Sequence, residues 1–464
     1  METSKHRKDF HYINLKEKNF QQKAPRTLID RLKFIGPSAI VTGSVVGSGS
    51  IVMTPLLGAA AGFTLLWWLL LSIWTKPIIQ AEISRYVVVT KKTFLEAFAE
   101  IPGPKTNING KTTSWLVWFM FLGVLPAIIG MGGLVGAVAE AGTNLFPSIN
   151  IELWVVLSCL ITWLILIRGS YSTLENILLG MVLVFSLITL VIAFSMQSTS
   201  YELSTAQVFS GLKFSLPFEY LPLALAVFGF TGISYGEIMA YTYWCLEKGY
   251  AKGSAEDIQE TKNWIRTMQT DVWVTIFFIT IGTLPFFFLG AGVLNTLPQL
   301  QESLATQSFW DVDIIGALQN MFSLVLGDWA KWLFIVLAFF ILYSTLLSGT
   351  AAFTRTISDY LISMGFIYEK ENTRKTLIKL IAFLVPFFSG VFYFLLPNPI
   401  TLLLIAGIWA AMGLPIVNIG AIYLSNKLQK ELQPSLFIKL ILWLSLLFQL
   451  SIAVLIVIDI SANF

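Results

Sequence analysis

The chain has 464 residues, of which 56% are apolar and 12% are charged, and its mean hydropathy is +0.74. Soluble domains carry roughly 25% charged residues, so this composition excludes a soluble enzyme or binding module. It predicts an all-α integral membrane protein with several membrane-spanning helices. The net charge of +3 becomes informative only when the charges are placed along the chain.

The first 33 residues form a basic tail, 1–33, ahead of the first apolar segment. Because that segment starts only at Phe34, the N-terminus is not expected to be a cleavable signal. Both histidines of the chain, His6 and His11, lie in this tail. The apolar segments therefore contain no histidine for metal ligation, proton transfer or serine-hydrolase chemistry.

Eleven apolar segments follow the tail, each long enough to cross a bilayer. We predict them at 34–57, 62–86, 114–137, 151–168, 173–195, 218–244, 271–293, 331–354, 377–396, 400–424 and 436–459. With a cytoplasmic N-terminus, all of the 30 Lys and Arg except Lys76, Lys213 and Lys331 fall on the inner side. This asymmetry predicts a plasma (inner) membrane protein with its N-terminus cytoplasmic and its C-terminus outside.

The first segment is interrupted at its centre by a run of Gly, Ser and Val that includes Gly47, Ser48, Gly49 and Ser50. Backbone groups left bare to lipid cost several kcal/mol each, so an unwound stretch at this depth is tolerated where it lines an enclosed cavity. Serine hydroxyls can satisfy the backbone groups that unwinding frees. The pattern predicts a broken helix beside a solute site.

The sixth segment carries a second interruption, which spans Gly232, Ile233, Ser234, Tyr235, Gly236 and Glu237. Segments 1 and 6 are the first members of two consecutive sets of five. Interrupted helices at matching places in two halves are typical of inverted-repeat transporters. We therefore predict a first repeat at 34–195, a second repeat at 218–424 and an additional eleventh helix at 436–459, with the substrate site formed by the two interruptions.

Several sequence runs resemble the Nramp family of divalent-metal transporters. They are Gly36-Pro37-Ser38-Ala39-Ile40-Val41, Gly62-Phe63-Thr64-Leu65-Leu66-Trp67, Arg85-Tyr86-Val87-Val88-Val89-Thr90-Lys91, Gly169-Ser170-Tyr171-Ser172-Thr173-Leu174-Glu175, and the Ser/Thr-rich stretch Ser344–Thr350. The resemblance covers nearly the whole chain. It implies a LeuT-like fold of two inverted five-helix repeats plus one extra helix, with helices 1 and 6 broken.

The metal ligands of that family do not carry over to this chain. Its Asp-Pro-Gly-Asn motif in helix 1 falls on residues 47–50, where only the glycine at Gly49 matches. Its Met-Pro-His motif in helix 6 falls near residues 233–235, and its acidic helix 3 position falls near Gly130. The identity of any metal bound here therefore stays unknown from the sequence.

Ionisable residues inside membrane segments are candidates for function, because a charge at the bilayer centre costs about 2.5–3.5 kcal/mol on insertion scales. Glu237, Lys76 and Glu82 are the candidates for coupling a proton or sodium ion to transport, and Lys76 is also expected to form a salt bridge or to snorkel. Near the inner face we expect three ion pairs, Glu82 with Arg85, Arg168 with Glu175 and Arg355 with Asp359.

These features favour a secondary transporter that carries a small inorganic ion by alternating access, and the resemblance favours a metal cation. Two half-helix N-termini with the hydroxyls of Ser48, Ser50 and Ser234 would instead suit a small anion or another small solute. A transport-inactive, receptor-like relative is a further alternative. A membrane enzyme is disfavoured, since no catalytic histidine is present, and neither a cofactor nor a nucleic acid partner is expected.

Overall fold

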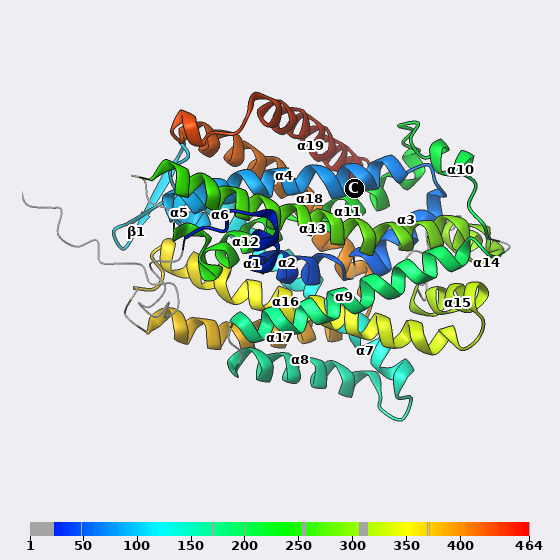
Figure 1. Cartoon of the computed structure of the whole chain (residues 1–464). Helices are drawn as coiled ribbons and strands as arrows, with labels where there is room; N and C mark the ends of the chain where they lie inside the picture. Colours follow the sequence, from blue (N-terminus) through cyan, green and yellow to red (C-terminus); the bar gives the residue numbers. More distant parts are fainter. Residues whose placement is uncertain are drawn as a thin grey trace, which may run out of the picture.

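The computed structural model describes residues 23–47, 49–168, 171–199, 201–252, 257–305, 314–368, 370 and 372–463. Within these ranges the protein is almost entirely helical, and the long helices run side by side along one direction (Figure 1). The uninterrupted long helices are α4 (Leu66–Thr90), α7 (Val124–Leu145), α8 (Ile151–Arg168), α9 (Tyr171–Met196), α13 (Ile258–Gly292), α16 (Ala330–Ser363), α17 (Thr373–Leu395), α18 (Pro399–Lys427) and α19 (Leu436–Asn463).

Both interruptions predicted from the sequence are present. In the first span, α2 (Pro37–Val45) is followed by the π-helical turn η2 (Gly49–Met53) and by α3 (Thr54–Ala61). The angle between α2 and the part made of η2 and α3 is 41°. In the sixth span, α11 (Leu221–Phe230) ends before α12 (Tyr235–Lys248) begins. The intervening backbone is extended at Thr231 and has φ +74° at Gly232, a conformation that suits glycine.

Within the part of the chain that the structure describes, eight helices are long and apolar enough to cross a membrane, and the bent first span makes a ninth. The other two predicted segments are also helical. Of these, α8 is apolar over a shorter stretch, Ile151–Ile167, and α4 carries several buried polar and charged side chains that lower its hydropathy. Every predicted segment thus coincides with a helix or a helix pair. The total of eleven crossings, and the boundaries of the two repeats, stay predictions.

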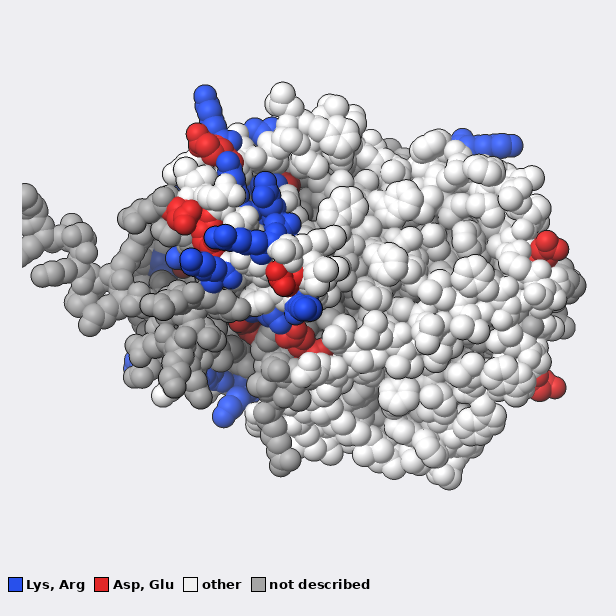
Figure 2. Space-filling view, viewed as in Figure 1, with Lys and Arg blue, Asp and Glu red and all other residues white. Residues whose placement is uncertain are grey.

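Charged side chains gather at one end of the molecule, over the region of β1 and α5, while the middle is almost free of them on the face shown (Figure 2). The predicted inner loops lie at this charged end. There they form the short helix α5 (Phe94–Phe98) and a hairpin of β1 (Lys105–Ile108) and β2 (Lys111–Ser114), in which Lys105 pairs with Ser114. The distribution is the one expected of a protein whose middle faces hydrocarbon.

The opposite end of the molecule contains short helices between the predicted segments 271–293 and 331–354. Between α13 and α16 the chain forms η5 (Leu294–Thr296), α14 (Pro298–Ala305) and α15 (Ile314–Leu326). α15 is amphipathic and buries Leu318, Met321 and Phe322. One apolar face is enough for such a surface helix to pack, even where the overall composition of the stretch is polar. The remaining short elements are α1 (Leu28–Phe34), α6 (Trp115–Leu122), α10 (Thr205–Ser210), η3 (Phe218–Tyr220), η4 (Tyr250–Lys252) and η7 (Lys430–Leu432).

The second half of the first span, which includes α3, packs backbone to backbone against α13. Gly58 of α3 faces Phe287 and Ala291, and Gly290 of α13 faces Pro55. A Cβ atom on Gly290 would lie 2.3 Å from the carbonyl oxygen of Pro55. Such close crossings depend on small residues, because dispersion forces between closely packed helices replace the hydrophobic effect inside a bilayer.

We therefore expect Gly290→Ala to destabilise the protein by about 1–3 kcal/mol, the usual penalty for overpacking. The matched control is Gly180→Ala in α9, where an added Cβ meets nothing within 4 Å. That change should preserve stability or raise it by about 0.5–1 kcal/mol through helix propensity. Thermal unfolding of both purified variants, followed by tryptophan fluorescence, measures the difference. Equal unfolding temperatures would contradict the packing described here.

Candidate functional site

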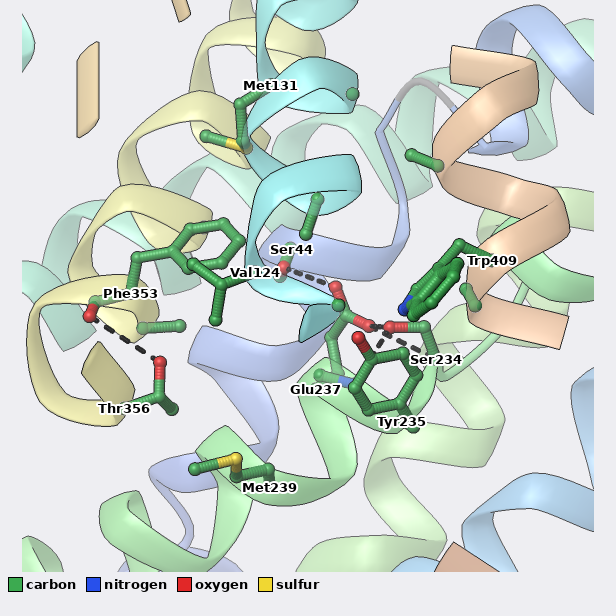
Figure 3. A pocket seen from close by; sticks show the side chains of 18 of the residues that line it. Ser44, Val124, Met131, Ser234, Tyr235, Glu237, Met239, Phe353, Thr356 and Trp409 are labelled. Carbon is green, nitrogen blue, oxygen red and sulfur yellow. Dashed lines mark hydrogen bonds between the residues drawn. The ribbon is translucent and has the colours of Figure 1, made fainter. Parts of the chain in front are cut away.

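A cavity of about 140 Å³ lies where the two broken spans meet α6, α7, α16 and α18 (Figure 3). Its described lining includes Ser44, Val45, Met120, Gly123, Val124, Ala127, Gly130, Met131, Leu134, Phe230, Ser234, Tyr235, Gly236, Glu237, Met239, Thr345, Gly349, Ala352, Phe353, Thr356, Tyr360, Ala406, Trp409 and Ala410. These residues come from α2, α6, α7, α11, α12, α16 and α18, together with the end of the second break.

The cavity extends from the breaks toward the charged end of the molecule. The α2, α12 and α16 residues that line it lie in the halves of those spans that lead to the charged end, and α6 starts there directly after β2. At the opposite end, the other halves of the two broken spans are closely packed: α3 packs against α13, and α11 packs against α18. The lining is therefore drawn mainly from the side on which Lys and Arg are concentrated.

Glu237 joins the two breaks. Its Oε1 accepts a hydrogen bond from the Ser44 hydroxyl at 3.2 Å, and its Oε2 accepts from the backbone N–H of Ser234 at 3.0 Å (Figure 3). The Ser234 hydroxyl also donates to Oε2, and the N–H of Gly236 donates to Ser234 Oγ at 3.2 Å. Ser234 and Glu237 thus form a capping box at the start of α12, which satisfies the amides that the break exposes.

Glu237 is also the one residue with a formal charge among the described residues that line the cavity. The other polar groups there are hydroxyls, which belong to Ser44, Ser234, Tyr235, Thr345, Thr356 and Tyr360, and the Trp409 indole. Three thioethers, those of Met120, Met131 and Met239, complete the set of heteroatoms. Within the described residues no cluster of three or more His, Cys, Asp or Glu is arranged to hold a metal ion. Any cation held here would therefore meet one carboxylate and several neutral ligands.

Four of the predicted site residues, Ser234, Tyr235, Gly236 and Glu237, line the cavity. Gly232 lies behind them, where a Cβ would come 2.9 Å from the carbonyl oxygen of Ser72 on α4. Its positive φ and this close approach both favour glycine. The neighbouring Ile233 is completely buried.

The predicted residues of the first break are packed against neighbouring spans. A Cβ on Gly47 would lie 1.6 Å from Thr345 Oγ1, and the carbonyl oxygen of Gly49 accepts a hydrogen bond from Thr54 at 2.8 Å. Ser50 is buried and shares a hydrogen bond of 2.8 Å with Thr283 of α13. Ser48 lies outside the described residues. None of Gly47, Gly49 and Ser50 is among the described residues that line the cavity.

The carbonyl ends of the two broken helices are also occupied by side chains. At the end of α2, the carbonyl oxygen of Gly43 accepts from Ser344 at 3.2 Å and from Thr345 at 3.1 Å. At the end of α11, Ser72 Oγ donates to the carbonyl oxygens of Phe228 at 3.2 Å and Thr231 at 2.7 Å. These contacts satisfy backbone acceptors that would otherwise be exposed inside the bilayer.

Lys76 also binds the carbonyl end of α11. Its Nζ donates to the carbonyl oxygens of Phe228 and, at 2.8 Å, Thr231, and to Ser72 Oγ at 3.0 Å. It also lies 4.5 Å from the centre of the Phe228 ring. The side chain is completely buried, so the expectation that it snorkels was wrong, and its partners are backbone carbonyls instead of a carboxylate in hydrogen-bond range. A helix C-terminus attracts a cation through its exposed carbonyls, which explains the placement.

Of the predicted ion pairs, Glu82 with Arg85 is confirmed, with an Nε–Oε2 distance of 2.7 Å. The pairing of Arg355 with Asp359 was wrong. Arg355 pairs with Glu247 at 3.1 Å because α12 packs against α16, while Asp359 faces Arg374 at the start of α17.

Glu175 pairs with Lys248 of α12 at 2.8 Å, while the side chain of its predicted partner Arg168 lies outside the described residues. Asp271 was missed in the sequence analysis although it is fully buried. It accepts from the N–H groups of Gly36 at 3.0 Å and Ser38 at 2.8 Å, and from the Tyr241 hydroxyl at 2.8 Å. A carboxylate at the start of an apolar segment was the sequence signal that pointed to it.

Two broken helices that enclose a polar cavity at mid-span define a secondary transporter with a LeuT-like fold. The chain belongs to the natural resistance-associated macrophage protein-like (Nramp) family, whose model matches residues 38–459. This membership confirms the resemblance seen in the sequence and supports the predicted transport of a metal ion. No curated protein matches the sequence.

Solved structures share the fold. A manganese transporter of Eremococcus coleocola superposes with a TM-score of 0.69 at 16% identity, over 97% of this chain and 90% of that one. MhsT in complex with L-phenylalanine gives 0.56 at 16% identity, over 96% and 100%. Mhp1, a nucleobase-cation-symport-1 family transporter, gives 0.57 at 13% identity, over 94% and 95%. At such identities the likeness establishes the architecture alone.

The geometry of the cavity predicts its accessibility. Ala352 lines the cavity. We therefore expect a cysteine introduced by Ala352→Cys to react with a charged methanethiosulfonate reagent that is added at the charged end of the protein. Ala351→Cys on the same helix is completely buried and serves as the matched control, which should react at least tenfold more slowly. Both variants need a background in which the free cysteines Cys159 and Cys245 are replaced by serine. Equal reaction rates at the two positions, or reaction of Ala352→Cys from the opposite side alone, would contradict the described cavity.

Proposed function

We propose that this protein carries a divalent metal cation across the membrane by alternating access, and that the cation occupies the cavity beside Glu237. The observation that carries the proposal is the position of this carboxylate. It lines the cavity, touches both broken helices, and is surrounded by hydroxyls and thioethers without a neighbouring basic side chain among the described lining residues. A cation entering from the charged end would meet this negative charge at the junction of the breaks.

The cation keeps part of its hydration shell in this proposal. One carboxylate balances half of a divalent charge, and stripping such an ion of water without full compensation is costly. Mg²⁺ gives up its water reluctantly and is commonly held by one or two carboxylates together with several waters. At about 30 Å³ per water molecule, a cavity of 140 Å³ has room for at least four. The carboxylate, the hydroxyls and the retained water also suit Mn²⁺, while the thioethers of Met131 and Met239 favour softer transition-metal ions.

The anion alternative has less support. Its predicted binding groups were helix N-termini and the hydroxyls of Ser48, Ser50 and Ser234. At the start of α12 the amides and the Ser234 hydroxyl already serve Glu237, whose charge would repel an anion. Ser50 donates to or accepts from Thr283, away from the described cavity lining.

We further propose that the cavity opens to the cytoplasm, with the N-terminus inside and the C-terminus outside in a plasma (inner) membrane. The concentration of Lys and Arg at the end to which the cavity leads supports this orientation. The coupling ion is proposed to be a proton or sodium, with Glu237, Lys76 and Glu82 as its candidate carriers.

The decisive experiment is uptake by the purified protein in liposomes, with Mg²⁺, Mn²⁺ and bicarbonate compared under proton and sodium gradients. We expect uptake of the cations, and at least a tenfold loss of apparent affinity in Glu237→Gln, because a hydrogen-bonded charge contributes about 1.5–3 kcal/mol and 1.4 kcal/mol is tenfold. Glu219→Gln, an exposed carboxylate at the other end of the same span, is the matched control and should match the wild type. Uptake of bicarbonate without either cation, or normal cation affinity in Glu237→Gln, would contradict the proposal.

A further inference from the structure

A stripe of buried polar side chains runs along α4, away from the break of the sixth span. Ser72, Lys76, Gln80 and Ser84 follow one another at intervals of four residues, and all four are 0% exposed. Residues four apart lie on the same side of a helix, one turn from each other. At about 1.5 Å per residue the stripe covers roughly 18 Å, more than half of a hydrocarbon core of about 30 Å.

Lys76, the second residue of the stripe, is surrounded in this conformation by hydrogen-bond acceptors that suit an ammonium ion. Its three N–H donors match three acceptors, which are Ser72 Oγ and the carbonyl oxygens of Phe228 and Thr231. A neutral amine would turn a lone pair toward those carbonyls, so the hydrogen bonds at the end of α11 favour the protonated form. Gly232 makes the arrangement possible, because its lack of a side chain lets the break lie directly on the α4 backbone at Ser72.

The next two positions of the stripe have no protein partner in the described part of the chain. Gln80 is fully buried, yet neither its Nε2 nor its Oε1 forms a hydrogen bond, and the hydroxyl of Ser84 is equally unpartnered. Leaving such groups unsatisfied costs about 1–3 kcal/mol each, and buried polar groups of this kind are the ones that bind ordered water. They lie one and two turns from Lys76 along α4, between Lys76 and the end of that helix at Thr90.

From these observations we propose that Lys76 is a proton-carrying residue, and that Gln80 and Ser84 form its route to the charged end of the protein. When α11 moves away from α4 during the transport cycle, the carbonyls that hold the ammonium leave. The proton then passes from Nζ to water held by Gln80 and onward to the Ser84 hydroxyl and its water, while the lone pair stays on nitrogen. Rebinding of a proton restores the ammonium before the carbonyls return. The inference rests on the proposed function for its link to metal transport.

The charged groups around Lys76 fit this role. Glu237 of α12 is the acidic side chain that interacts electrostatically with Lys76. A change of charge at the proposed cation site therefore changes the electrostatic energy of the proposed proton carrier. Several other titratable groups on neighbouring described elements bind partners other than Lys76. Asp271 of α13 binds Gly36, Ser38 and Tyr241, Glu82 binds Arg85 on α4 itself, Glu96 caps α5, and Lys427 of α18 binds Glu100. α11 contributes carbonyls and the Phe228 ring.

The test uses the full chain in liposomes that contain a pH-sensitive dye, with two measurements. The first is proton flux accompanying Mg²⁺ or Mn²⁺ uptake, expressed per metal ion. The second is proton flux without metal, driven by a potassium gradient and valinomycin. The variants are Lys76→Met, Gln80→Leu and Ser84→Ala, with Thr75→Val as the matched control, since Thr75 lies on α4 outside the stripe and bonds its own helix at Leu71.

We expect Lys76→Met to abolish both proton fluxes, Gln80→Leu to lower them at least fivefold and Ser84→Ala to lower them about twofold, with Thr75→Val unchanged. If Lys76→Met does not fold, Gln80→Leu decides the question. Wild-type proton flux in Gln80→Leu, or metal uptake by the wild type with no proton flux in either assay, overturns the inference. A wild type that carries no metal but conducts protons through Gln80 would overturn the proposed function and leave this route standing.

Discussion

The constraint on which this structure depends is that a backbone unwound inside a bilayer must have its polar groups satisfied by other parts of the protein. Three of the four ends of the breaks meet this demand with particular side chains. Ser344 and Thr345 serve the carbonyl end of α2, Ser72 and Lys76 serve the carbonyl end of α11, and the capping box of Ser234 and Glu237 serves the amide end of α12. At these three ends the protein itself supplies the partners of the backbone groups.

The same contacts set the polarity of the cavity. A lysine would make an uncharged cavity attractive to anions, but Lys76 is turned to the α11 carbonyls and is not among the described lining residues. The carboxylate of Glu237 is the group that faces the cavity (Figure 3). Opposite charges thus lie on the two sides of one break, and the sign presented to an entering ion follows from which of them lines the cavity.

The breaks, the predicted segments and the position of Glu237 beside the second break were predictable because each has a local signal, such as a cluster of glycine and hydroxyl residues or a charge in an apolar run. The side on which a side chain lies was less predictable. The π-helical turn η2 shifts the register after Gly49, so Ser50 faces α13. The partner of Arg355 depends on how α12 packs against α16, a contact between residues 108 positions apart. Local spacing favoured Asp359 as the partner of Arg355, whereas the packing of α12 against α16 brings Glu247 to it.

The departure from the family's helix 1 motif also has an energetic meaning. Two unit charges 4 Å apart interact by about 4 kcal/mol at an effective dielectric constant of 20. One carboxylate at such a distance cannot replace the hydration of a divalent ion, and the first break offers glycines and serines where the family has two metal-binding side chains. A cavity that leaves water on the ion resolves this deficit. Selection would then act on the size of the hydrated ion and on the reach of Glu237, because few protein atoms would touch the metal itself.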